Sequence, residues 1–374
     1  MTLTLVATCL FGLERLLGEE IDALGYTRVS TIDGRVTFVG DEAAVARANV
    51  FLRYAERIYI KLGSFSAESF EELFEGTRAL PFADFLGRDD AFPVKGHAIK
   101  SKLHSIPDCQ SIIKKAAVRA MSERYGILHF PETGTKYQIE FFILNDEATV
   151  MIDTSGTPLH KRGYRRESNG APIRETLAAA IAATARPREN VLFWDPMCGS
   201  GTIAIEAARL MKNIAPGKSR AFSAEEYPII PAPLWRAARD EAIAGERTTD
   251  FEVYASDIDP AAVALTEKNV RLAEVADTVK VFSADARRIS AEGRRGTIVT
   301  NPPYGERLGT RAGAEALYRE IGTRFRSLAP WQVYIITSHQ GFERFYGKRA
   351  DKVRKLYNGM IPCYLYQYFK NAKM

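Results

Sequence analysis

The stretch Val191-Leu192-Phe193-Trp194-Asp195-Pro196-Met197-Cys198-Gly199-Ser200-Gly201-Thr202 decides the fold that this sequence predicts. The apolar run up to Trp194 is typical of a short buried strand, the small residues after it indicate a sharp turn, and Thr202 begins a helix that continues through Ala208. A strand that passes through glycine into a helix N-terminus offers backbone N–H groups and a positive dipole end to a ligand. The stretch therefore predicts an α/β domain with a small-ligand site at this turn.

The residues of the turn narrow the choice of ligand. A dinucleotide-binding turn carries three glycines at fixed spacing, and a phosphate-cradling loop ends in Gly-Lys-Ser or Gly-Lys-Thr. This turn has only Gly199 and Gly201, and no lysine follows. Asp195, at the carboxyl end of the strand, places a carboxylate where it can meet a cationic group. An ordinary strand-loop-helix corner is the alternative, but the turn resembles the first motif of S-adenosylmethionine-dependent methyltransferases, in which Asp195 would face the amino-acid end of the cofactor.

A second buried strand, Thr297–Thr300, ends in Asn301-Pro302-Pro303-Tyr304. Prolines cannot donate backbone hydrogen bonds and fix their own φ, so the carbonyl groups of this segment are rigid and unpaired with the sheet. The Asn301 side-chain oxygen and the Pro302 carbonyl can both accept from an NH2 group, and Tyr304 offers a ring for a base to stack on. The segment resembles the fourth motif of amino-methyltransferases, which methylate adenine N6, cytosine N4 or guanine N2. We therefore predict that Asn301, Pro302, Pro303 and Tyr304 form the catalytic segment.

Acidic residues follow two further predicted strands. Asp257 follows Phe251–Ala255, and Asp285 follows Val279–Phe282. Each acid by itself could be a helix cap, but their repetition at successive strand ends indicates a site. We assign Asp257 to the ribose hydroxyls, with Asp259 as its competitor, and Asp285 to an adenine amine. The predicted cofactor-binding residues are Asp195, Cys198, Gly199, Ser200, Gly201, Thr202, Asp257 and Asp285, with Cys198 a small packing residue and no nucleophile.

The composition is that of a globular protein of two or three domains, with 374 residues, 46% hydrophobic and 26% charged. The net charge of +5 is modest, but the cations cluster, which favours polyanionic partners. Four singly scattered cysteines indicate neither a disulfide framework nor a zinc site, so we expect a reducing compartment and no metal. No stretch has transmembrane length, and the apolar start lacks a basic n-region, so we expect a cytoplasmic protein without a membrane partner.

The first two segments of the chain carry the charge clusters. Residues 1–65 predict a βαββαβ order that is ferredoxin-like, with Asp33-Gly34 as a hairpin turn. In residues 66–160, the stretch from Lys95 to Arg119 contains six lysines and arginines but only one acid. Helical spacing predicts that Lys114, Lys115 and Arg119 of this stretch point to solvent. Charge runs are often only solvated surfaces, but the surroundings of Lys95-Gly96 and Ser111 resemble the THUMP domain, an RNA-binding module. The predicted RNA-binding residues are Lys95, Lys100, Lys102, Lys114, Lys115 and Arg119, with Arg165 and Arg166 from a basic cluster that could equally be a bland linker.

Taken together, the ferredoxin-like start (1–65), the THUMP-like middle (66–160) and the methyltransferase-like end (161–374) resemble one family along nearly the whole chain. These are the bacterial THUMP-containing guanine-N2 methyltransferases of large-subunit ribosomal RNA, the RlmL type. The resemblance implies a Rossmann-like, seven-stranded sheet that ends in an antiparallel hairpin. It also implies methylation of a guanine N2 in 23S rRNA, free or in a ribosomal precursor, with S-adenosylhomocysteine as product. We expect a monomer or a weak dimer.

The sequence leaves two other functions open. The Asn-Pro-Pro-Tyr segment applies equally to a DNA or RNA adenine-N6 methyltransferase, although the sequence shows no recognisable DNA-reading motif. A non-catalytic RNA-binding assembly factor is the alternative of another class. The complete set of Asp195, Asp257, Asp285 and Asn301 argues against that factor.

Overall fold

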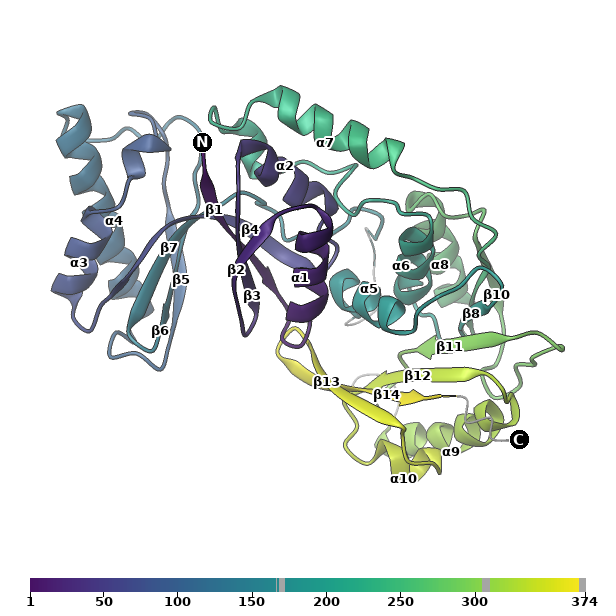
Figure 1. Ribbon diagram of the computed structural model, residues 1–374. Coiled ribbons are helices and arrows are strands. Elements are labelled where there is room, and N and C mark those ends of the chain that lie inside the picture. The colour runs from purple at the N-terminus through teal and green to yellow at the C-terminus, as the bar shows by residue number, and fades with distance from the viewer. Residues whose placement is uncertain (166, 168–171, 305–309, 370–374) are drawn as a thin grey trace.

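The computed structural model describes residues 1–165, 167, 172–304 and 310–369, which form two seven-stranded sheets (Figure 1). The first sheet has the order β2-β3-β1-β4-β7-β6-β5 and the second the order β10-β9-β8-β11-β12-β14-β13. The first half of the chain builds the first sheet and the second half builds the second. The strands of the first sheet are β1 (Leu3–Cys9), β2 (Thr27–Ile32), β3 (Arg35–Gly40), β4 (Ala55–Ser66), β5 (Val94–Ile99), β6 (Ile139–Leu144) and β7 (Glu147–Asp153).

The N-terminal segment has the predicted ferredoxin-like order, with α1 (Glu14–Ala23) after β1 and α2 (Glu42–Phe51) before β4. Leu17 and Ile21 bury one face of α1 against the sheet because they lie one helical turn apart. Gly34 turns the β2–β3 hairpin with a φ of 76°, a conformation that a β-carbon would disfavour. These local signals were readable in the sequence, and the structure confirms the fold that they predicted.

Strand β4 joins the ferredoxin-like and THUMP parts into one sheet. Its first half, Ala55–Ile60, pairs with β1, and its second half, Tyr59–Ser66, pairs with β7. The sequence pattern predicts this strand over Arg57–Leu62, and the observed strand runs four residues further, to Ser66. The THUMP part adds the helices α3 (Phe70–Arg78) and α4 (Ile106–Tyr125) and the short 3-10 helix η1 (Phe82–Asp84).

The second sheet has the strand arrangement expected from the sequence. All neighbours in β10-β9-β8-β11-β12 are parallel, and β14 is antiparallel to both β12 and β13. The dipeptide Asn358-Gly359 predicts a tight turn between two strands, and the β13–β14 hairpin turns there, with Gly359 at a φ of 66°. The strands are β8 (Leu192–Asp195), β9 (Val253–Asp257), β10 (Val279–Ser283), β11 (Gly296–Thr300), β12 (Gln332–Thr337), β13 (Lys352–Asn358) and β14 (Ile361–Tyr368).

The helices of the second domain are α5 (Glu175–Thr184), α6 (Thr202–Met211), α8 (Pro260–Leu272), α9 (Arg311–Ser327) and α10 (Phe342–Tyr346). The sequence predicts a helix of small residues from Ala171 to Ala185, but Ala171 lies outside the described residues. The helix begins instead at Glu175, because Arg174 before it is extended, with φ −65° and ψ 144°. No helix of the described ranges is long and apolar enough to cross a membrane.

The forty or so residues between α6 and β9 dock the two sheets together. They contain η2 (Ser223–Glu226) and α7 (Ala232–Ala244), and α7 packs along α2 of the N-terminal domain (Figure 1). Arg47 of α2 forms an ion pair with Glu241 of α7 at 2.7 Å, and Tyr227 stacks on Tyr137 with ring centroids 4.0 Å apart. This segment, which separates Asp195 from Asp257 in the sequence, therefore has a structural task, because it links the methyltransferase part to α2 and Tyr137 of the N-terminal half.

Candidate active site

The predicted site residues gather at one edge of the second sheet. Strands β8, β9 and β11 are parallel neighbours, so their carboxyl ends meet at the same edge. Asp195 ends β8, Asp257 ends β9 and Asn301 follows β11. The hydroxyl of Thr300 donates to Asp195 Oδ1 at 2.7 Å, inside the core. This hydrogen bond joins the cofactor-type turn directly to the Asn-Pro-Pro-Tyr segment.

Asp195 is a buried carboxyl group, with 2% of its surface exposed. Burial raises its pKa to about 7, although the hydrogen bonds from Thr300 and from the Met197 N–H oppose the shift, and Asp257 adds to it. A carboxyl group with a pKa near neutrality is well suited to a cationic partner, because the partner would remove the cost of its ionisation.

The glycine turn is held from one side by α8. Thr266 donates its hydroxyl to the Gly199 carbonyl at 2.8 Å, and Asn269 donates its amide to the Ser200 carbonyl at 2.9 Å. A β-carbon at Gly201, whose φ is 79°, would lie 2.6 Å from the Thr266 methyl group, so only glycine fits there. At Gly199, by contrast, no described atom lies within 4 Å of the position that a β-carbon would occupy. The turn is therefore fixed on its α8 side and open on the other.

Three side chains pack around the turn. Thr266 and Asn269 were not predicted, and their spacing of three residues on one helix face was the signal available for them. Cys198 is buried with its sulfur 3.5 Å from the Thr266 hydroxyl, and burial raises the pKa of its thiol well above the ordinary value. A thiol of this kind is unreactive, in agreement with its interpretation as a packing residue.

The structure separates the roles of Asp257 and Asp259. Asp257 accepts from the Gly199 N–H at 2.9 Å through Oδ2 and from the Asp259 N–H at 3.0 Å through Oδ1, so it faces the turn. Asp259 is exposed and caps α8 by accepting from the Ala261 N–H at 2.9 Å. Of these two acids, Asp257 is therefore the one that lies beside the glycine turn, while Asp259 caps α8.

Two features at this edge could not be read from the sequence, the ion pair at Asp285 and the exposure of Ile258. Asp285 lies after β10 as expected, but its carboxylate is held by Arg287 at 2.7 Å, and this hydrogen-bonded pair lowers the Asp285 pKa. A ligand amine at Asp285 would share the carboxylate with that guanidinium. Ile258, between Asp257 and Asp259, is 62% exposed and was not predicted. The available signal was an apolar residue between two acids at a strand end.

Two tyrosines hold the Asn-Pro-Pro-Tyr segment, its own Tyr304 and Tyr318 of α9. Tyr304 donates its hydroxyl to Asn301 Oδ1, and Tyr318 of α9 donates to the Pro303 carbonyl at 2.8 Å. Within the described ranges, no backbone hydrogen bond ends on the Pro302 carbonyl. Tyr304 therefore orients the Asn301 amide in addition to presenting its ring. Residues 305–309, which continue the motif in the sequence, lie outside the described residues.

Models of known families match the chain in three consecutive segments. They are the RlmL ferredoxin-like domain over residues 4–59, the THUMP domain over residues 67–153 and the RMKL-like methyltransferase domain over residues 162–367. The chain belongs to the THUMP-containing, RlmL-like methyltransferases. The family resemblance stated from the motifs is thereby confirmed.

Individual relatives agree with this assignment. The chain is 42% identical to "Putative RNA methyltransferase YpsC" of Bacillus subtilis over 99% of its own length and 97% of that protein. It is 32% identical to ribosomal RNA large subunit methyltransferase K/L of Pseudomonas putida over 96% of its own length but 51% of that protein, so it spans about half the length of such relatives. The crystal structure of SMU.472 complexed with SAH is 39% identical, covers 100% of this chain and 99% of its own, and superimposes with a TM-score of 0.92.

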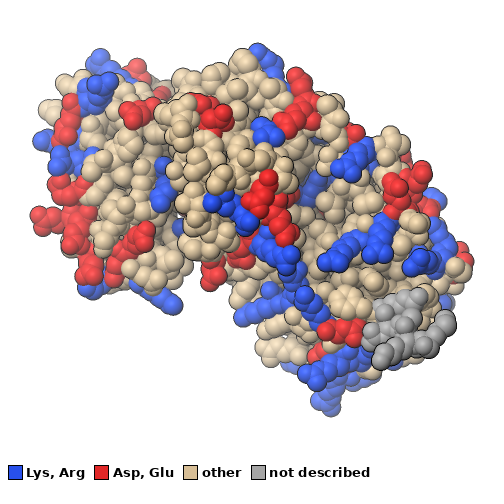
Figure 2. Space-filling model, viewed as in Figure 1, with Lys and Arg blue, Asp and Glu red and all other residues tan. Residues whose placement is uncertain are grey.

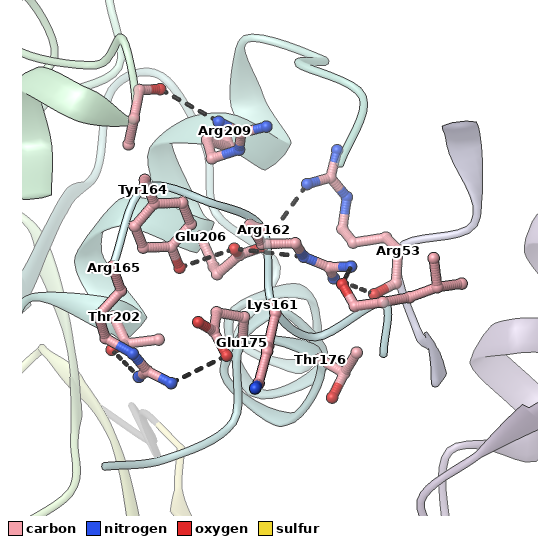
Figure 3. A network of polar contacts seen from close by, with 12 residues as sticks. Arg53, Lys161, Arg162, Tyr164, Arg165, Glu175, Thr176, Thr202, Glu206 and Arg209 are labelled. Carbon is pink, nitrogen blue, oxygen red and sulfur yellow. Dashed lines mark hydrogen bonds and ion pairs between the residues drawn. The ribbon is translucent and has the colours of Figure 1, made fainter. Parts of the chain in front are cut away.

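In this RlmL-like methyltransferase, Arg165 lies inside the molecule, which corrects its prediction as a free RNA contact. Its guanidinium forms an ion pair with Glu175 at 3.0 Å and donates to the Thr202 hydroxyl at 2.9 Å, and its side chain is 10% exposed (Figure 3). Because Thr202 begins α6, Arg165 ties the first residues of the methyltransferase domain to the cofactor-type turn. Arg166, predicted beside it, lies outside the described residues.

A buried cluster around Glu206 of α6 connects the two domains. Tyr164 donates to Glu206 Oε1 at 2.9 Å, while Arg162 and Arg53 lie 3.8 and 3.7 Å from its two oxygens (Figure 3). Glu206 has no exposed surface, and the side chains of Arg53 and Arg162 are 6% and 1% exposed. Arg53 comes from the N-terminal domain, so this cluster anchors that domain to the helix that follows the turn.

The predicted cations of the THUMP domain fall into two groups. Lys102 pairs with Glu68, Lys114 with Glu132 at 2.5 Å, and Arg119 with Glu123 at 3.2 Å. Lys114 also lies 3.5 Å from the centre of the Phe92 ring and is half-buried, so its prediction as a solvent-facing residue was wrong.

Lys95, Lys100 and Lys115 are exposed, and the structure shows no described acid paired with them. These three carry the free positive charge among the residues predicted in this domain. Within the described ranges, no group of three or more His, Cys, Asp or Glu side chains lies together in a way that could hold a metal ion.

Proposed function

We propose that this protein transfers the methyl group of S-adenosylmethionine to an exocyclic amine of RNA, namely guanine N2 of 23S rRNA. The observation that carries the proposal is the Thr300 to Asp195 hydrogen bond, which puts an amine-binding segment beside a cofactor-type turn on adjacent strands. The choice of RNA rests on the THUMP domain and on the printed names of the B. subtilis and P. putida relatives.

The residues at the turn fit the cofactor. Asp195 offers a buried carboxylate to the cationic amino group, Asp257 offers carboxylate oxygens to the ribose, and the open side of Gly199 leaves backbone to approach a ligand closely. The related structure SMU.472 holds SAH. When bound, the cofactor supplies a methyl group on a sulfonium that leaves as a neutral thioether.

The chain's own residues then act by positioning. The second lone pair of Asn301 Oδ1 and the Pro302 carbonyl accept the two hydrogens of the guanine amine, which directs the nitrogen lone pair at the methyl carbon. Tyr304 stacks on the base, which must leave its helix to reach a site inside the domain. As the nitrogen–carbon bond forms and the carbon–sulfur bond breaks, the amine releases one proton to the solvent water. Orientation of this kind accounts for large rate effects without a covalent intermediate.

Nucleoside analysis tests the proposed function. Purified protein is incubated with S-adenosylmethionine and 23S rRNA transcribed in vitro, and the RNA is digested to nucleosides for mass spectrometry. We expect N2-methylguanosine. N6-methyladenosine would overturn the choice of base and favour the adenine-N6 alternative, while 5-methylcytidine would also overturn the amine mechanism.

We expect S-adenosylhomocysteine to bind more weakly as the pH falls below about 7, where Asp195 takes up a proton. If only the ionised carboxyl group binds the ligand's ammonium, the affinity falls by about 10-fold per pH unit below the pKa. Calorimetric titrations between pH 6 and 8 measure this slope. Asp195→Asn keeps the oxygen that accepts from Thr300 and Met197, so it is the matched control and reports the pH dependence of the ligand alone. Equal slopes in both proteins would contradict a contact between Asp195 and the ligand.

The raised Asp195 pKa has a second, opposite consequence for the protein without ligand. In the unfolded chain this carboxyl group ionises near its model value of 3.8, whereas in the folded protein it ionises near 7. The folded state therefore holds the proton more tightly, and the stability that this group contributes is lost as the pH rises between those two values.

Tyr304→Phe is expected to lower kcat by about 2- to 10-fold, the scale of a single hydrogen bond. The ring that stacks on the base is kept, but the hydroxyl that orients Asn301 is removed. Steady-state kinetics with RNA as the varied substrate should show the change in kcat and little change in KM. Tyr304→Ala, which also removes the ring, is expected to raise the RNA KM as well. A variant Tyr304→Phe with the kcat of the native protein would show that the hydroxyl has no part in positioning.

A further inference from the structure

A second site of a different kind lies at the opposite edge of the methyltransferase sheet. A cavity of about 510 Å3 opens between α1 of the N-terminal domain, the segment that follows α5, and the sheet itself. Its lining includes Gly296 and Thr297, where β11 begins, and Gln332, where β12 begins. The proposed methyl-transfer site lies at the other ends of these strands. We call this cavity the basic cleft, after its cations Arg186, Arg188, Arg295, Lys352 and Arg354.

Among the described residues, no acid neutralises the charge of the basic cleft. No described Asp or Glu oxygen lies within 4.0 Å of any of its five named cations. The acid in the lining, Glu19, is already paired with Arg15 at 2.7 Å. Figure 2 shows Lys and Arg atoms gathered over the region where α1, β13 and β11 lie in Figure 1. The cleft therefore concentrates unpaired positive charge, in contrast to the THUMP cations Lys102, Lys114 and Arg119, which are paired.

Gln367 adds a hydrogen-bond donor to the floor of the basic cleft. It is 3% exposed, and its Nε2 has no hydrogen-bond partner among the described residues. The strand register places Gln367 opposite both Lys352 and Tyr334, so the three side chains share one face of the sheet and line the cleft together. A buried amide donor without an acceptor is unfavourable, and an anionic oxygen bound in the cleft would satisfy it.

The backbone at Arg186 is also unusual. Arg186 follows α5 with a φ of 52°, in the left-handed region where glycine or asparagine is the ordinary residue after a helix. A side chain in this conformation is strained, and it projects a guanidinium into the lining of the cleft. The strain is consistent with a functional task for that guanidinium.

The dimensions allow one extended polyanion to reach from the basic cleft to the proposed methyl-transfer site. Arg295 lies at the start of β11 and Asn301 just past its end, so the two are separated by one strand length, about 20 Å at 3.3 Å per residue. A nucleic acid helix carries one phosphate per about 3.4 Å along each strand, so a segment of about six to ten nucleotides spans that distance. One RNA molecule can therefore reach both edges of the sheet.

We propose that the basic cleft binds the phosphate backbone of the substrate RNA outside the target nucleotide, as an RNA interface separate from the THUMP domain. This inference rests on the proposed function, RNA methylation. The cations contribute affinity and orientation without reading sequence, because phosphates are the same at every nucleotide. The N-terminal and methyltransferase domains both line the cleft, so bound RNA touches the two domains at once.

A charge-reversal experiment tests the cleft. The cleft variant carries Arg186→Glu, Arg188→Glu and Lys352→Glu, all at exposed positions. The matched control carries Arg236→Glu, Arg247→Glu and Arg271→Glu, which are exposed, lie outside the cleft lining and change the net charge equally. Binding of 23S rRNA transcribed in vitro is measured between 50 and 200 mM salt. Thermal unfolding and the affinity for S-adenosylhomocysteine report whether each variant keeps its fold.

We expect the cleft variant to bind this RNA at least about 10-fold more weakly than the control variant, with a salt slope smaller by about 0.9 for each phosphate that the cleft no longer neutralises. Affinity for S-adenosylhomocysteine should be the same in both. Equal RNA affinity and equal slope in the two variants overturn the inference. Tight binding of inorganic pyrophosphate that the cleft variant loses, with RNA affinity unchanged, also overturns it and assigns the cleft to a small anion.

The outcomes separate this inference from the proposed function. If native protein binds the rRNA in a cleft-dependent way but forms no N2-methylguanosine, the cleft stands and the proposed reaction fails. If native protein forms N2-methylguanosine and the cleft variant binds RNA as the control does, the proposed reaction stands and the cleft fails.

Discussion

Asn301→Ala is expected to lower kcat for RNA methylation by about 100-fold, the scale on which removal of a positioning group slows a reaction. The Asn301 oxygen is one of two acceptors that hold the exocyclic amine in line with the methyl group. Its removal leaves only the Pro302 carbonyl, and the amine then samples orientations that do not react. Affinity for RNA and for S-adenosylhomocysteine should stay close to that of the native protein, because Asn301 acts on the reacting atom.

Single-turnover kinetics with saturating protein measure this effect apart from product release. Asn301→Asp is the matched control, because a carboxylate keeps acceptor oxygens at the same place and can still receive the Tyr304 hydroxyl hydrogen. It should lose much less activity than Asn301→Ala. If Asn301→Ala methylates RNA at the native single-turnover rate, Asn301 does not position the amine and the proposed mechanism fails.

Glu206→Ala is expected to lower the free energy of unfolding by about 3–5 kcal/mol, the usual cost of removing one partner from a buried ion pair. Glu206 has no exposed surface and lies between Arg53 and Arg162, both buried. Without the carboxylate, the guanidinium groups of Arg53 and Arg162 remain in the interior without their ion-pair partner, and Tyr164 loses its acceptor. The domain interface and the start of α6 both depend on these interactions.

Denaturant unfolding followed by circular dichroism and by tryptophan fluorescence measures the change. Glu206→Gln keeps an acceptor for Tyr164 and removes only the charge, so the difference between the two variants isolates the charge contribution. Arg119→Ala, in an exposed pair with Glu123 at side-chain exposures of 62% and 47%, should change stability by less than about 1 kcal/mol. A Glu206→Ala protein as stable as the Arg119→Ala protein would show that the buried cluster does not hold the domains together.

The sequence by itself determined the features that depend on neighbours along the chain. Apolar runs, glycine turns and strand-end acids lie within a few residues of one another, so the glycine turn after β8, the Asn358-Gly359 hairpin and the ferredoxin-like order could all be predicted. The motifs also indicated the family. Element ends were less certain, as at β4 and α5, because strand pairing and capping decide where an element stops.

Only the tertiary structure decided which charges are free. Arg165 and Lys114 belong to basic runs in the sequence, yet Glu175 and Glu132, which lie outside those runs, neutralise them. The basic cleft shows the converse, because its cations come from segments that no local pattern connects. Spacing along the chain predicts the face on which a side chain lies, whereas its partner depends on which surfaces the fold brings together. The same reason kept the Thr300 to Asp195 hydrogen bond, across 105 residues, out of reach of the sequence.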